Sequence, residues 1–495
     1  MTSHSRKEPI SKVDTAWLRM EQPTNLMMIT GIMTLNEGID YERLVRTVEA
    51  RFLSFRRFRQ KAVDNARGAN WELDEDFDIY SHVRRVALPG NADKAELEEY
   101  VSYLASTPLN KSRPLWQFHY IENYIGGPVV VTRIHHCYAD GIALVQVMLT
   151  LTDGSSEEQE AEVDSETWKR ERTTESSVFR RLTEPAREGI DFAVHWGFKL
   201  VEEGLKVIQE PELAGKYAGE VTEIVQELTH ALTLSDDPKT VFKGDLGIRK
   251  EVAWTDSIAL DEVKAISKVL GCTVNDVLIA AVTGALRRYM LDRGEAIDSI
   301  NEIRATVPVN LRPLEHAKEL GNHFGVVFLS LPTSESHPLR RVYEVSARMN
   351  ELKNSKQATV ALGLLAALGM GPAALQKPSL ELLSQKASTV LTNVPGPREP
   401  LFLAGGEVRS MMFWVPQNGS IGMGVSILSY NGKVFFGVMT DRKIVPDPNA
   451  IIENFGPELE RLLKLCMMLP LDELPCCDTA DELLENSLLL LADKN

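Results

Sequence analysis

A short acidic segment divides this chain and limits what it can fold into. Residues 153–166 hold seven Asp and Glu residues among Gly, Ser, Gln and Ala, and such a stretch buries too little apolar surface to order itself. Residues 177–234 then repeat apolar residues at helical spacing, which predicts bridging helices. The chain is therefore predicted to form two folded units joined by a linker. The predicted ranges are 1–152 for the first unit, 153–240 for the linker and its helices, 241–470 for the second unit and 471–495 for a tail.

Both units alternate β-branched apolar runs with runs of helical spacing. In the first unit the pattern predicts strands over 26–35 and 128–134 and helices over 41–52 and 142–151. In the second unit the predicted helices are 260–270 and 274–290, and the predicted strands are 251–254, 304–309, 324–331, 408–415, 421–430 and 433–440. Asn431-Gly432 predicts a tight hairpin between the last two strands. The expected fold class is α/β, with mixed sheets covered by helices.

The charge balance excludes one large class of function. Lys and Arg total 54 and Asp and Glu total 70, which gives a net charge of −16. A body this acidic repels phosphate backbones, so no nucleic-acid partner is expected, and membrane contact would need a local basic or apolar patch. The five cysteines show no CxxC motif, and the polar N-terminal residues show no secretory signal. A reducing, cytoplasmic location is therefore expected.

One uncharged run raises the question of a membrane span. Residues 358–375 contain no charged side chain over 18 positions, a length that approaches one bilayer crossing. Gly363, Gly369, Gly371, Pro372 and many alanines make this run weakly apolar. We therefore expect a core helix, or a helix that lines an apolar tunnel.

The run Ile134-His135-His136-Cys137-Tyr138-Ala139-Asp140-Gly141 lies between a predicted buried strand and a predicted buried helix. Successive side chains of an extended segment point to opposite faces, so only one of His135 and His136 can face a given cavity. A neutral imidazole there can take a proton from an attacking hydroxyl and return it to a leaving group. Asp140, just before a glycine that permits a tight turn, is expected to fix the turn rather than complete a triad.

Other kinds of site fit the sequence less well. A buried histidine is often only a hydrogen-bonded core residue. The segment Gly419-Ser420-Ile421-Gly422 does not match the G-x-S-x-G elbow of serine hydrolases. A metal site is not indicated, because the remaining histidines stand singly at His4, His82, His119, His195, His230, His316, His323 and His337.

The H-H-x-x-x-D-G pattern after a Val-rich strand resembles the signature of the acyltransferase superfamily that includes chloramphenicol acetyltransferase and peptide-synthetase condensation domains. More closely, the chain resembles the bacterial wax ester synthase/acyl-CoA:diacylglycerol acyltransferase family. The motifs that carry this resemblance follow the family's order and are residues 71–78, Pro114-Leu115-Trp116, Asn275-Asp276-Val277-Leu278, residues 307–312 and residues 392–398. The resemblance implies two chloramphenicol-acetyltransferase-like domains joined by a helical linker.

The resemblance also implies a reaction. His136 would be the general base that deprotonates the hydroxyl of a fatty alcohol or a diacylglycerol, and that oxygen would attack the thioester of a long-chain acyl-CoA. The product would be a wax ester or a triacylglycerol, formed without an acyl-enzyme. His135 would position the site, and Asp140 would hold the turn. Neither a metal nor a cofactor is implied, because acyl-CoA is itself a substrate.

Four further residues are expected to contact substrate. Asn275 offers a neutral donor at a helix start, where it would hold substrate or the developing oxyanion, or act only as an N-cap. Thr392 and Asn393 belong to a loop that two prolines and a glycine fix, and this loop would wall the acyl channel or simply join the two halves. Gly141, next to Asp140, completes the set.

Two features depart from the family. Pro23-Thr24-Asn25-Leu26-Met27-Met28 stands where many members carry Pro-Met-His, and residues 471–495 add an acidic and then Leu-rich tail. That tail is expected to form an amphipathic helix on a membrane or on the protein itself. A basic cluster would meet CoA phosphates or lipid head groups, or be a solvated helix end, and it comprises Arg56, Arg57, Arg59 and Lys61. Insoluble substrates add the expectation of peripheral attachment to a membrane or a lipid droplet.

Two alternative functions stay open at this point. One is a condensation-type transfer of an acyl or peptidyl group from a carrier protein, although no carrier segment is evident in the chain. The other is a non-catalytic lipid-binding or lipid-droplet protein. The presence of His135 and His136 with Asp140-Gly141 weighs against the second alternative, because a carrier needs no base.

Overall fold

The structure is a computed structural model that describes most of both predicted units. The described residues are 7–65, 68–155, 234–297, 302–311, 320–322, 324–353, 355, 357–358, 360–361, 381, 383–417 and 419–469. Most of the linker (153–240), most of the uncharged run (358–375), Arg312 and the tail (471–495) lie outside these residues. The expectations for those segments stay predictions.

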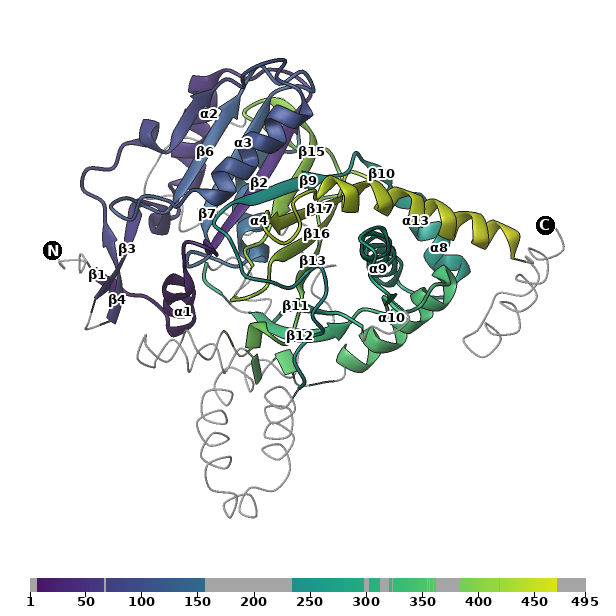
Figure 1. The fold of residues 1–495 in the computed structure, drawn as a ribbon. Helices are drawn as coiled ribbons and strands as arrows, with labels where there is room; N and C mark the ends of the chain where they lie inside the picture. The colour runs from purple at the N-terminus through teal and green to yellow at the C-terminus, as the bar shows by residue number, and fades with distance from the viewer. Residues whose placement is uncertain are drawn as a thin grey trace, which may run out of the picture.

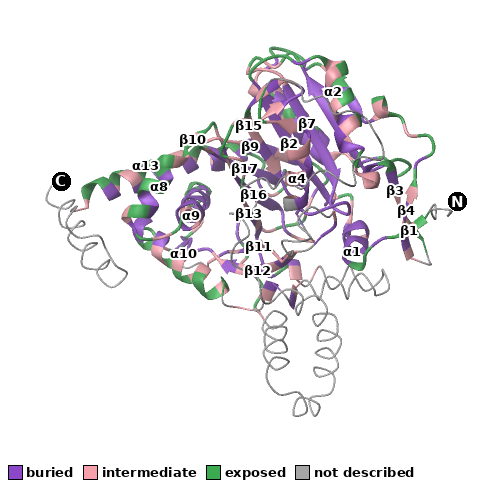
Figure 2. Ribbon diagram, turned by 180° about the vertical axis from the view of Figure 1, so that it is seen from behind, coloured by how far each residue is buried: buried purple, intermediate pink, exposed green. Residues whose placement is uncertain are grey.

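The first sheet combines strands of the first unit with two strands of the second. Its order is β5 (Val83–Val86), β6 (Trp116–Ile121), β7 (Val129–His135), β2 (Met28–Leu35), β15 (Gly406–Trp414), β14 (Phe402–Leu403) and β8 (Thr152–Asp153). The pair β5–β6 is parallel, and every other pair of neighbours in this order is antiparallel. Every residue of β2 and β7 is buried, as expected for strands covered on both faces. These central strands form the buried middle of the molecule in Figure 2.

The second sheet is mixed. Its order is β10 (Ile258–Ala259), β17 (Lys433–Asp441), β16 (Met423–Tyr430), β13 (Thr389–Pro395), β11 (Arg304–Asn310) and β12 (Phe324–Ser330), and β9 (Lys250–Trp254) also pairs with β17. Strand β13 runs parallel to both β11 and β16. The hairpin between β16 and β17 turns at Asn431 and Gly432, both with positive φ (47° and 71°), which confirms the predicted Asn-Gly turn.

Helices lie around both sheets (Figure 1). In the first unit they are α1 (Lys12–Met20), α2 (Tyr41–Thr47), α3 (Lys94–Ser106) and α4 (Gly141–Thr150), with short turns η1 (Val48–Phe52), η2 (Arg56–Arg59) and η3 (Ile79–Ser81). In the second unit they are α8 (Leu260–Val269), α9 (Val274–Asp292), α10 (Pro338–Lys353) and α13 (Asn449–Met468). A three-stranded sheet, β1 (Lys7–Pro9), β4 (Gly68–Leu73) and β3 (Gln60–Asn65), lies beside α1.

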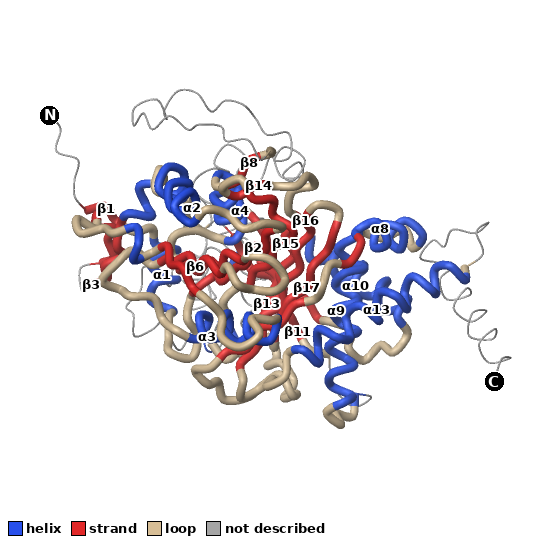
Figure 3. The backbone as a smooth tube through the Cα atoms, turned by 90° about the horizontal axis from the view of Figure 1, so that it is seen from above, coloured by secondary structure: helices blue, strands red, loops and turns tan. Residues whose placement is uncertain are grey.

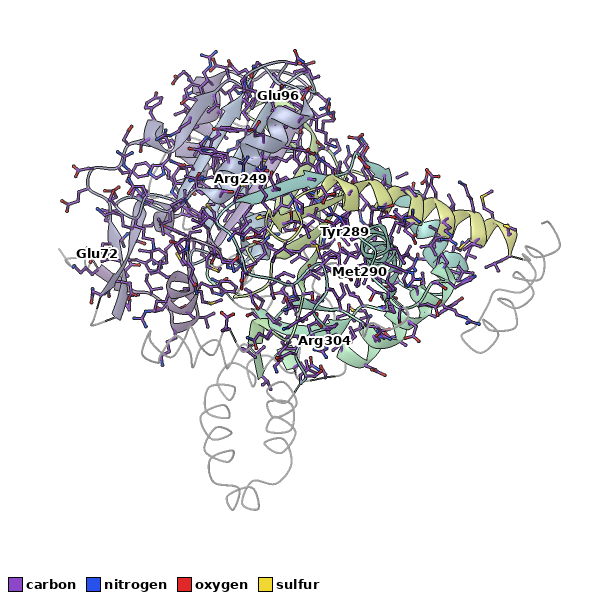
Figure 4. The ribbon with its side chains drawn as sticks, viewed as in Figure 1. Glu72, Glu96, Arg249, Tyr289, Met290 and Arg304 are labelled. Atoms are coloured by element: carbon purple, nitrogen blue, oxygen red, sulfur yellow. The ribbon has the colours of Figure 1, made fainter. Side chains whose placement is uncertain are left out.

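Helix α9 is the centre of the helical side of the second unit. It contacts α8, α10 and α13, and Figures 1 and 3 show these three helices gathered around it. Tyr289 and Met290, labelled on α9 in Figure 4, are 2% and 0% exposed. A helix that is apolar on all sides is stable only when it is enclosed in this way.

The two units share one core across the strand β15. Its residues belong to the second unit, yet the strand pairs with β2 of the first unit, with Met411 opposite Met33. Trp414 of β15 is fully buried and packs edge-on against Trp254 of β9, with ring centroids 5.4 Å apart. Helix α3 makes a second contact between the two units, because the Ser102 hydroxyl accepts a hydrogen bond of 2.9 Å from the Val252 amide of β9.

The expected α/β class with mixed sheets is confirmed, and two local expectations need correction. The helix predicted over 41–52 ends at Thr47 and continues as the π-turn η1. Thr392 and Asn393 were expected in a loop, but they lie inside strand β13. In the sheet, β13 lies between β11 and β16. Its β-branched residues Val390 and Thr392 favour a strand, and the strand continues to Pro395.

The helices were also tested as membrane spans. Within the described part of the chain, every helix taken singly is too short or too polar to cross a bilayer. Only α8 and α9 counted together reach the required length and apolar composition, and these two helices meet at a bend of 103°.

Candidate active site

The histidine motif forms the strand–turn–helix unit expected from the sequence. Strand β7 ends at His135, which lies opposite Met28 of β2. The next residue leaves the strand, and the His136 amide donates a 2.7 Å hydrogen bond to the Met27 carbonyl. Helix α4 then begins at Gly141, with Asp140 as its N-cap. The turn therefore separates the environments of the two histidines.

His135 is held by a hydrogen bond at one ring nitrogen and lies close to a carboxylate at the other. Its Nδ1 accepts a 3.1 Å hydrogen bond from the Cys137 amide, so Nε2 carries the ring proton. Nε2 lies 3.0 Å from Oε2 of Glu21, the residue that follows α1. Glu21 Oε1 lies 2.7 Å from the Lys111 ammonium. Burial works to raise the pKa of Glu21, but the contacts with His135 and Lys111 outweigh it and lower that pKa to about 2.

His136 occupies a different environment, in contact with two aromatic rings. Its imidazole stacks on Trp17 with ring centroids 4.1 Å apart and an interplanar angle of 14°, and Phe324 lies tilted at 5.7 Å. The residue is 5% exposed, and among the described residues its Nδ1 has no hydrogen-bond partner. Burial lowers the pKa of His136 to about 4, although the charge of Asp140 opposes this shift. The imidazole is therefore neutral at pH 7, with one nitrogen free to accept a proton.

Asp140 and Gly141 define the start of α4. The Asp140 carboxylate is buried and accepts a 2.9 Å hydrogen bond from the Ala143 amide, so it fixes the turn as predicted. A Cβ added at Gly141 would meet no described atom within 4 Å. Open space thus lies beside the first residue of the helix.

The second unit closes over the turn through Gly321 and Asn322. Gly321 donates its amide to the Tyr138 carbonyl at 3.1 Å and accepts from the Asp140 amide at 3.3 Å. Its φ of 108° favours glycine. The Asn322 side chain donates a 2.8 Å hydrogen bond to the His136 carbonyl. His136 therefore lies where the two units meet.

Three of the four predicted substrate residues, Asn275, Thr392 and Asn393, lie at a separate place, on α9 and β13. Asn393 Nδ2 donates a 2.7 Å hydrogen bond to Asn275 Oδ1, and both residues are partly exposed. Thr392 points to the other side of β13, where its hydroxyl lies 3.4 Å from the Val425 carbonyl. Asn275 is not the N-cap of α9, because Thr273 fills that role in a capping box with Asp276. Within the described residues, neither asparagine hydrogen-bonds to the histidine motif.

Pro114-Leu115-Trp116 supports the motif from the neighbouring strand. The Leu115 carbonyl accepts a 2.9 Å hydrogen bond from the His135 amide, and the Tyr138 hydroxyl accepts one of 3.0 Å from the Leu115 amide. Trp116 is fully buried and donates its indole N–H to the Phe58 carbonyl at 2.8 Å. These residues fix the backbone on which the histidines stand.

The predicted basic cluster and the possibility of a metal site were both checked in the structure. Of the basic cluster, Arg56 and Arg57 pair with Glu8, and Lys61 pairs with Asp74. Among the described residues, no group of three or more His, Cys, Asp or Glu side chains could hold a metal ion.

Sequence reasoning missed four residues that surround the histidines: Asp14, Trp17 and Glu21 near the N-terminus, and Asn322. The first three are spaced by three and four positions, which places them on one face of a helix. Carboxylates on the same helix face as an apolar Trp are unusual, so the spacing of Asp14, Trp17 and Glu21 could have indicated a functional cluster. Asn322 offered no comparable signal, because its role depends on a contact between the two units.

Two models of known protein families match this chain. The family model of the wax ester synthase/diacylglycerol acyltransferase catalytic domain matches residues 10–278, and the model of the WS/DGAT C-terminal domain matches residues 320–463. The chain belongs to this family. The resemblance inferred from the H-H-x-x-x-D-G pattern and its accompanying motifs is thereby confirmed.

Individual relatives agree with membership of the WS/DGAT family. The chain is 30% identical over 399 residues to tgs2 of Mycobacterium tuberculosis, named a probable diacylglycerol O-acyltransferase, with 79% of this chain and 83% of that protein covered. A wax ester synthase/diacylglycerol acyltransferase from Marinobacter aquaeolei VT8 matches in structure with a TM-score of 0.63 and 20% identity, covering 93% of this chain and 100% of that chain. The first condensation domain of the calcium-dependent antibiotic synthetase matches with a TM-score of 0.57 and 14% identity over 94% and 97% of the two chains. The expected two-domain fold of the chloramphenicol acetyltransferase type is confirmed.

Replacing Glu21 by Gln tests the anchoring of His135. The pKa of Glu21 is lower in the folded chain than its usual value of 4.5, so its stabilising effect is present above pH 4.5 and is lost as the pH falls toward 2. We expect E21Q to lower the unfolding free energy by about 1–2 kcal/mol at pH 7 and by progressively less below pH 4.5. Urea denaturation at a series of pH values measures the difference, with the exposed Glu37→Gln as control. A difference that stays constant from pH 7 to pH 3 would contradict the anchoring.

Proposed function

We propose that this chain transfers a long-chain acyl group from acyl-CoA to the hydroxyl of a diacylglycerol or a fatty alcohol, with His136 as the general base. The chain is an acyl-CoA-dependent O-acyltransferase by its family and its relatives. The observation that carries the assignment of the base is the neutral, buried imidazole at the junction of the two units, whose Nδ1 has no hydrogen-bond partner among the described residues.

The proposed reaction needs one proton transfer in each direction. His136 takes the proton from the acceptor hydroxyl while the oxygen of that hydroxyl attacks the carbonyl carbon of the thioester. The tetrahedral intermediate then collapses, the carbon–sulfur bond breaks, and the CoA sulfur leaves with the proton that His136 returns. The ester and free CoA are the products. No acyl-enzyme is required, because both substrates meet at one base.

The surroundings of His136 support acyl transfer rather than hydrolysis. Trp17 is 7% exposed and covers one ring face, and Phe324 lies against the ring as well. Water would compete with the acceptor hydroxyl for the same base and the same thioester. An enclosed, apolar site limits this competition.

Further roles in substrate binding belong to the same proposal. The amide group of Asn393 uses one of its hydrogens on Asn275, which leaves polar hydrogen-bonding capacity at the partly exposed start of α9. We assign this pair to the polar part of a substrate. The space beside Gly141 would admit the reacting groups to the motif, and Thr392, whose hydroxyl is engaged in the sheet, would contribute to the channel wall. No metal or cofactor takes part in the proposed steps.

The alternative of a carrier-protein condensation enzyme is not favoured. The similarity to condensation domains is 14% in sequence and concerns the fold. The match to the WS/DGAT catalytic model spans residues 10–278, which include the whole histidine motif. A non-catalytic lipid carrier is disfavoured by the same match and by His136 Nδ1, which no group in the described part of the chain engages.

Replacing His136 by Ala tests the role of the base. Loss of a general base is expected to lower kcat by about 10²–10⁴-fold, because the acceptor hydroxyl then has no group to take its proton. Release of CoA thiol from palmitoyl-CoA, with hexadecanol or a diacylglycerol as acceptor, measures the rate. His119→Gln is the matched control, since His119 is buried in the adjacent strand and contacts Tyr100. An H136A enzyme that turns over at the wild-type rate would overturn the proposal.

The pH dependence of kcat/KM provides an independent test. A histidine base with an ordinary pKa of about 6.5 would be only about one-tenth neutral at pH 5.5. Burial lowers the pKa of His136 to about 4, so we expect kcat/KM to change little between pH 7 and pH 5.5 and to fall only below about pH 5. Thiol release across this range in one constant-ionic-strength buffer series measures it. An acidic limb centred at 6.5 would contradict the described environment of His136.

We also propose that the protein attaches peripherally to a membrane or a lipid droplet, because both acceptors are insoluble in water. Support comes from Met467 and Met468 at the end of α13, which are 79% and 57% exposed. The chain is expected to sediment with phosphatidylcholine vesicles that contain diacylglycerol and to be released by salt or detergent. A chain that stays in the supernatant with and without vesicles would exclude this attachment. The cytoplasmic location stays a prediction.

A further inference from the structure

A buried carboxylate outside the histidine motif is connected to the base. Asp14 lies on α1 and is 7% exposed. Its Oδ1 accepts two hydrogen bonds from one residue of the second unit, at 3.1 Å from the Asn322 amide and at 2.7 Å from Asn322 Nδ2. Its Oδ2 accepts a 2.7 Å hydrogen bond from the Ser11 hydroxyl. Both oxygens are thus engaged, so Asp14 is not itself available to take a proton from a substrate.

Asn322 uses both hydrogens of its side-chain amide on defined acceptors. Nδ2 donates to Asp14 Oδ1 and also to the His136 carbonyl, at 2.8 Å. A primary amide nitrogen carries two hydrogens and can therefore serve two acceptors, while the backbone N–H of Asn322 makes the third bond. Asn322 is 4% exposed, so the loss of either acceptor would leave a buried donor unpaired.

Hydrogen bonds hold the backbone of the base on both sides of its Cα. The His136 amide donates to the Met27 carbonyl, and the His136 carbonyl accepts from Asn322. The ring of His136 stacks on Trp17, which lies on α1 three residues after Asp14. Helix α1 therefore contacts the base twice, once through the ring of Trp17 and once through Asp14 and Asn322.

We propose that Asp14 and Asn322 are positioning residues of the acyl transfer, which hold His136 in its reactive place by tying helix α1 and the second unit to its backbone carbonyl. This inference rests on the proposed role of His136 as the base. A displacement of a catalytic group by about 1 Å can lower the rate about 10²-fold, and the Asp14–Asn322 pair prevents such a displacement.

The charge of Asp14 matters less than its acceptor oxygen. Burial raises the pKa of Asp14 to about 6, against the opposing hydrogen bonds of Ser11 and Asn322 and the charge of Arg57. A proton on Oδ2 would face Ser11 and leave Oδ1 free to accept from Asn322. Asp14→Asn keeps a carbonyl oxygen at this position, whereas Asp14→Leu keeps the size and removes the acceptor.

The test compares four variants with the wild-type enzyme in the thiol-release assay. We expect Asn322→Ala to lower kcat by about 10–100-fold with KM changed by less than about threefold, because the base is displaced while substrate binding is retained. Asp14→Leu should behave like N322A, and Asp14→Asn should stay within about threefold of wild type. The double variant D14L/N322A should be no slower than the slower single variant, as for residues that act as one unit. Thermal unfolding of each variant shows that the assayed protein is folded.

The outcomes separate this inference from the proposed function. If N322A is folded and keeps the wild-type kcat, the positioning role is wrong, whatever the result for H136A. If H136A keeps its activity, the role of the base is wrong and the positioning role falls with it. Should N322A not fold, Asn322→Ser serves in its place, since one hydroxyl hydrogen cannot serve both acceptors. A wild-type kcat in folded N322S would then overturn the inference.

Discussion

The pairing of β15 with β2 is the contact on which the rest of the structure depends. Because this strand joins a sheet of the other unit, Trp414 and Met412 enter the first core, and the two units cannot be separated without opening that sheet. The same arrangement brings Gly321 and Asn322 against the turn that follows β7. The position of His136 is thus a property of the junction and of neither unit alone.

The two histidines have different surroundings at this junction. His135 is held between the Cys137 amide and the Glu21 carboxylate, so its tautomer and orientation are fixed. His136 stacks on Trp17 with Phe324 beside it, and burial away from solvent keeps it neutral. The same buried turn therefore holds His135 in a fixed orientation and places the base His136 directly beside it. This division is possible because β7 ends at His135 and His136 already belongs to the turn.

Much of the local structure could be predicted from the sequence, and the reasons are local. The Val-rich run before His135, the Asn431-Gly432 turn and the apolar helix after Thr273 each carry their signal within a few residues. The prediction of a loop at Thr392 and Asn393 was wrong, because the prolines and the glycine that follow them suggested a loop although both residues lie in strand β13. Neighbouring strands from distant parts of the chain hold these residues in the sheet.

The sequence by itself determined the class of fold, the histidine motif and the family, because these depend on periodicity and on short motifs. Only the tertiary structure decided which groups surround the base. Asp14, Glu21 and Asn322 act through contacts between residues that lie up to 308 positions apart. Such contacts leave no mark in a local pattern, since hydrogen bonds between distant segments exist only once the two units have packed together and excluded water.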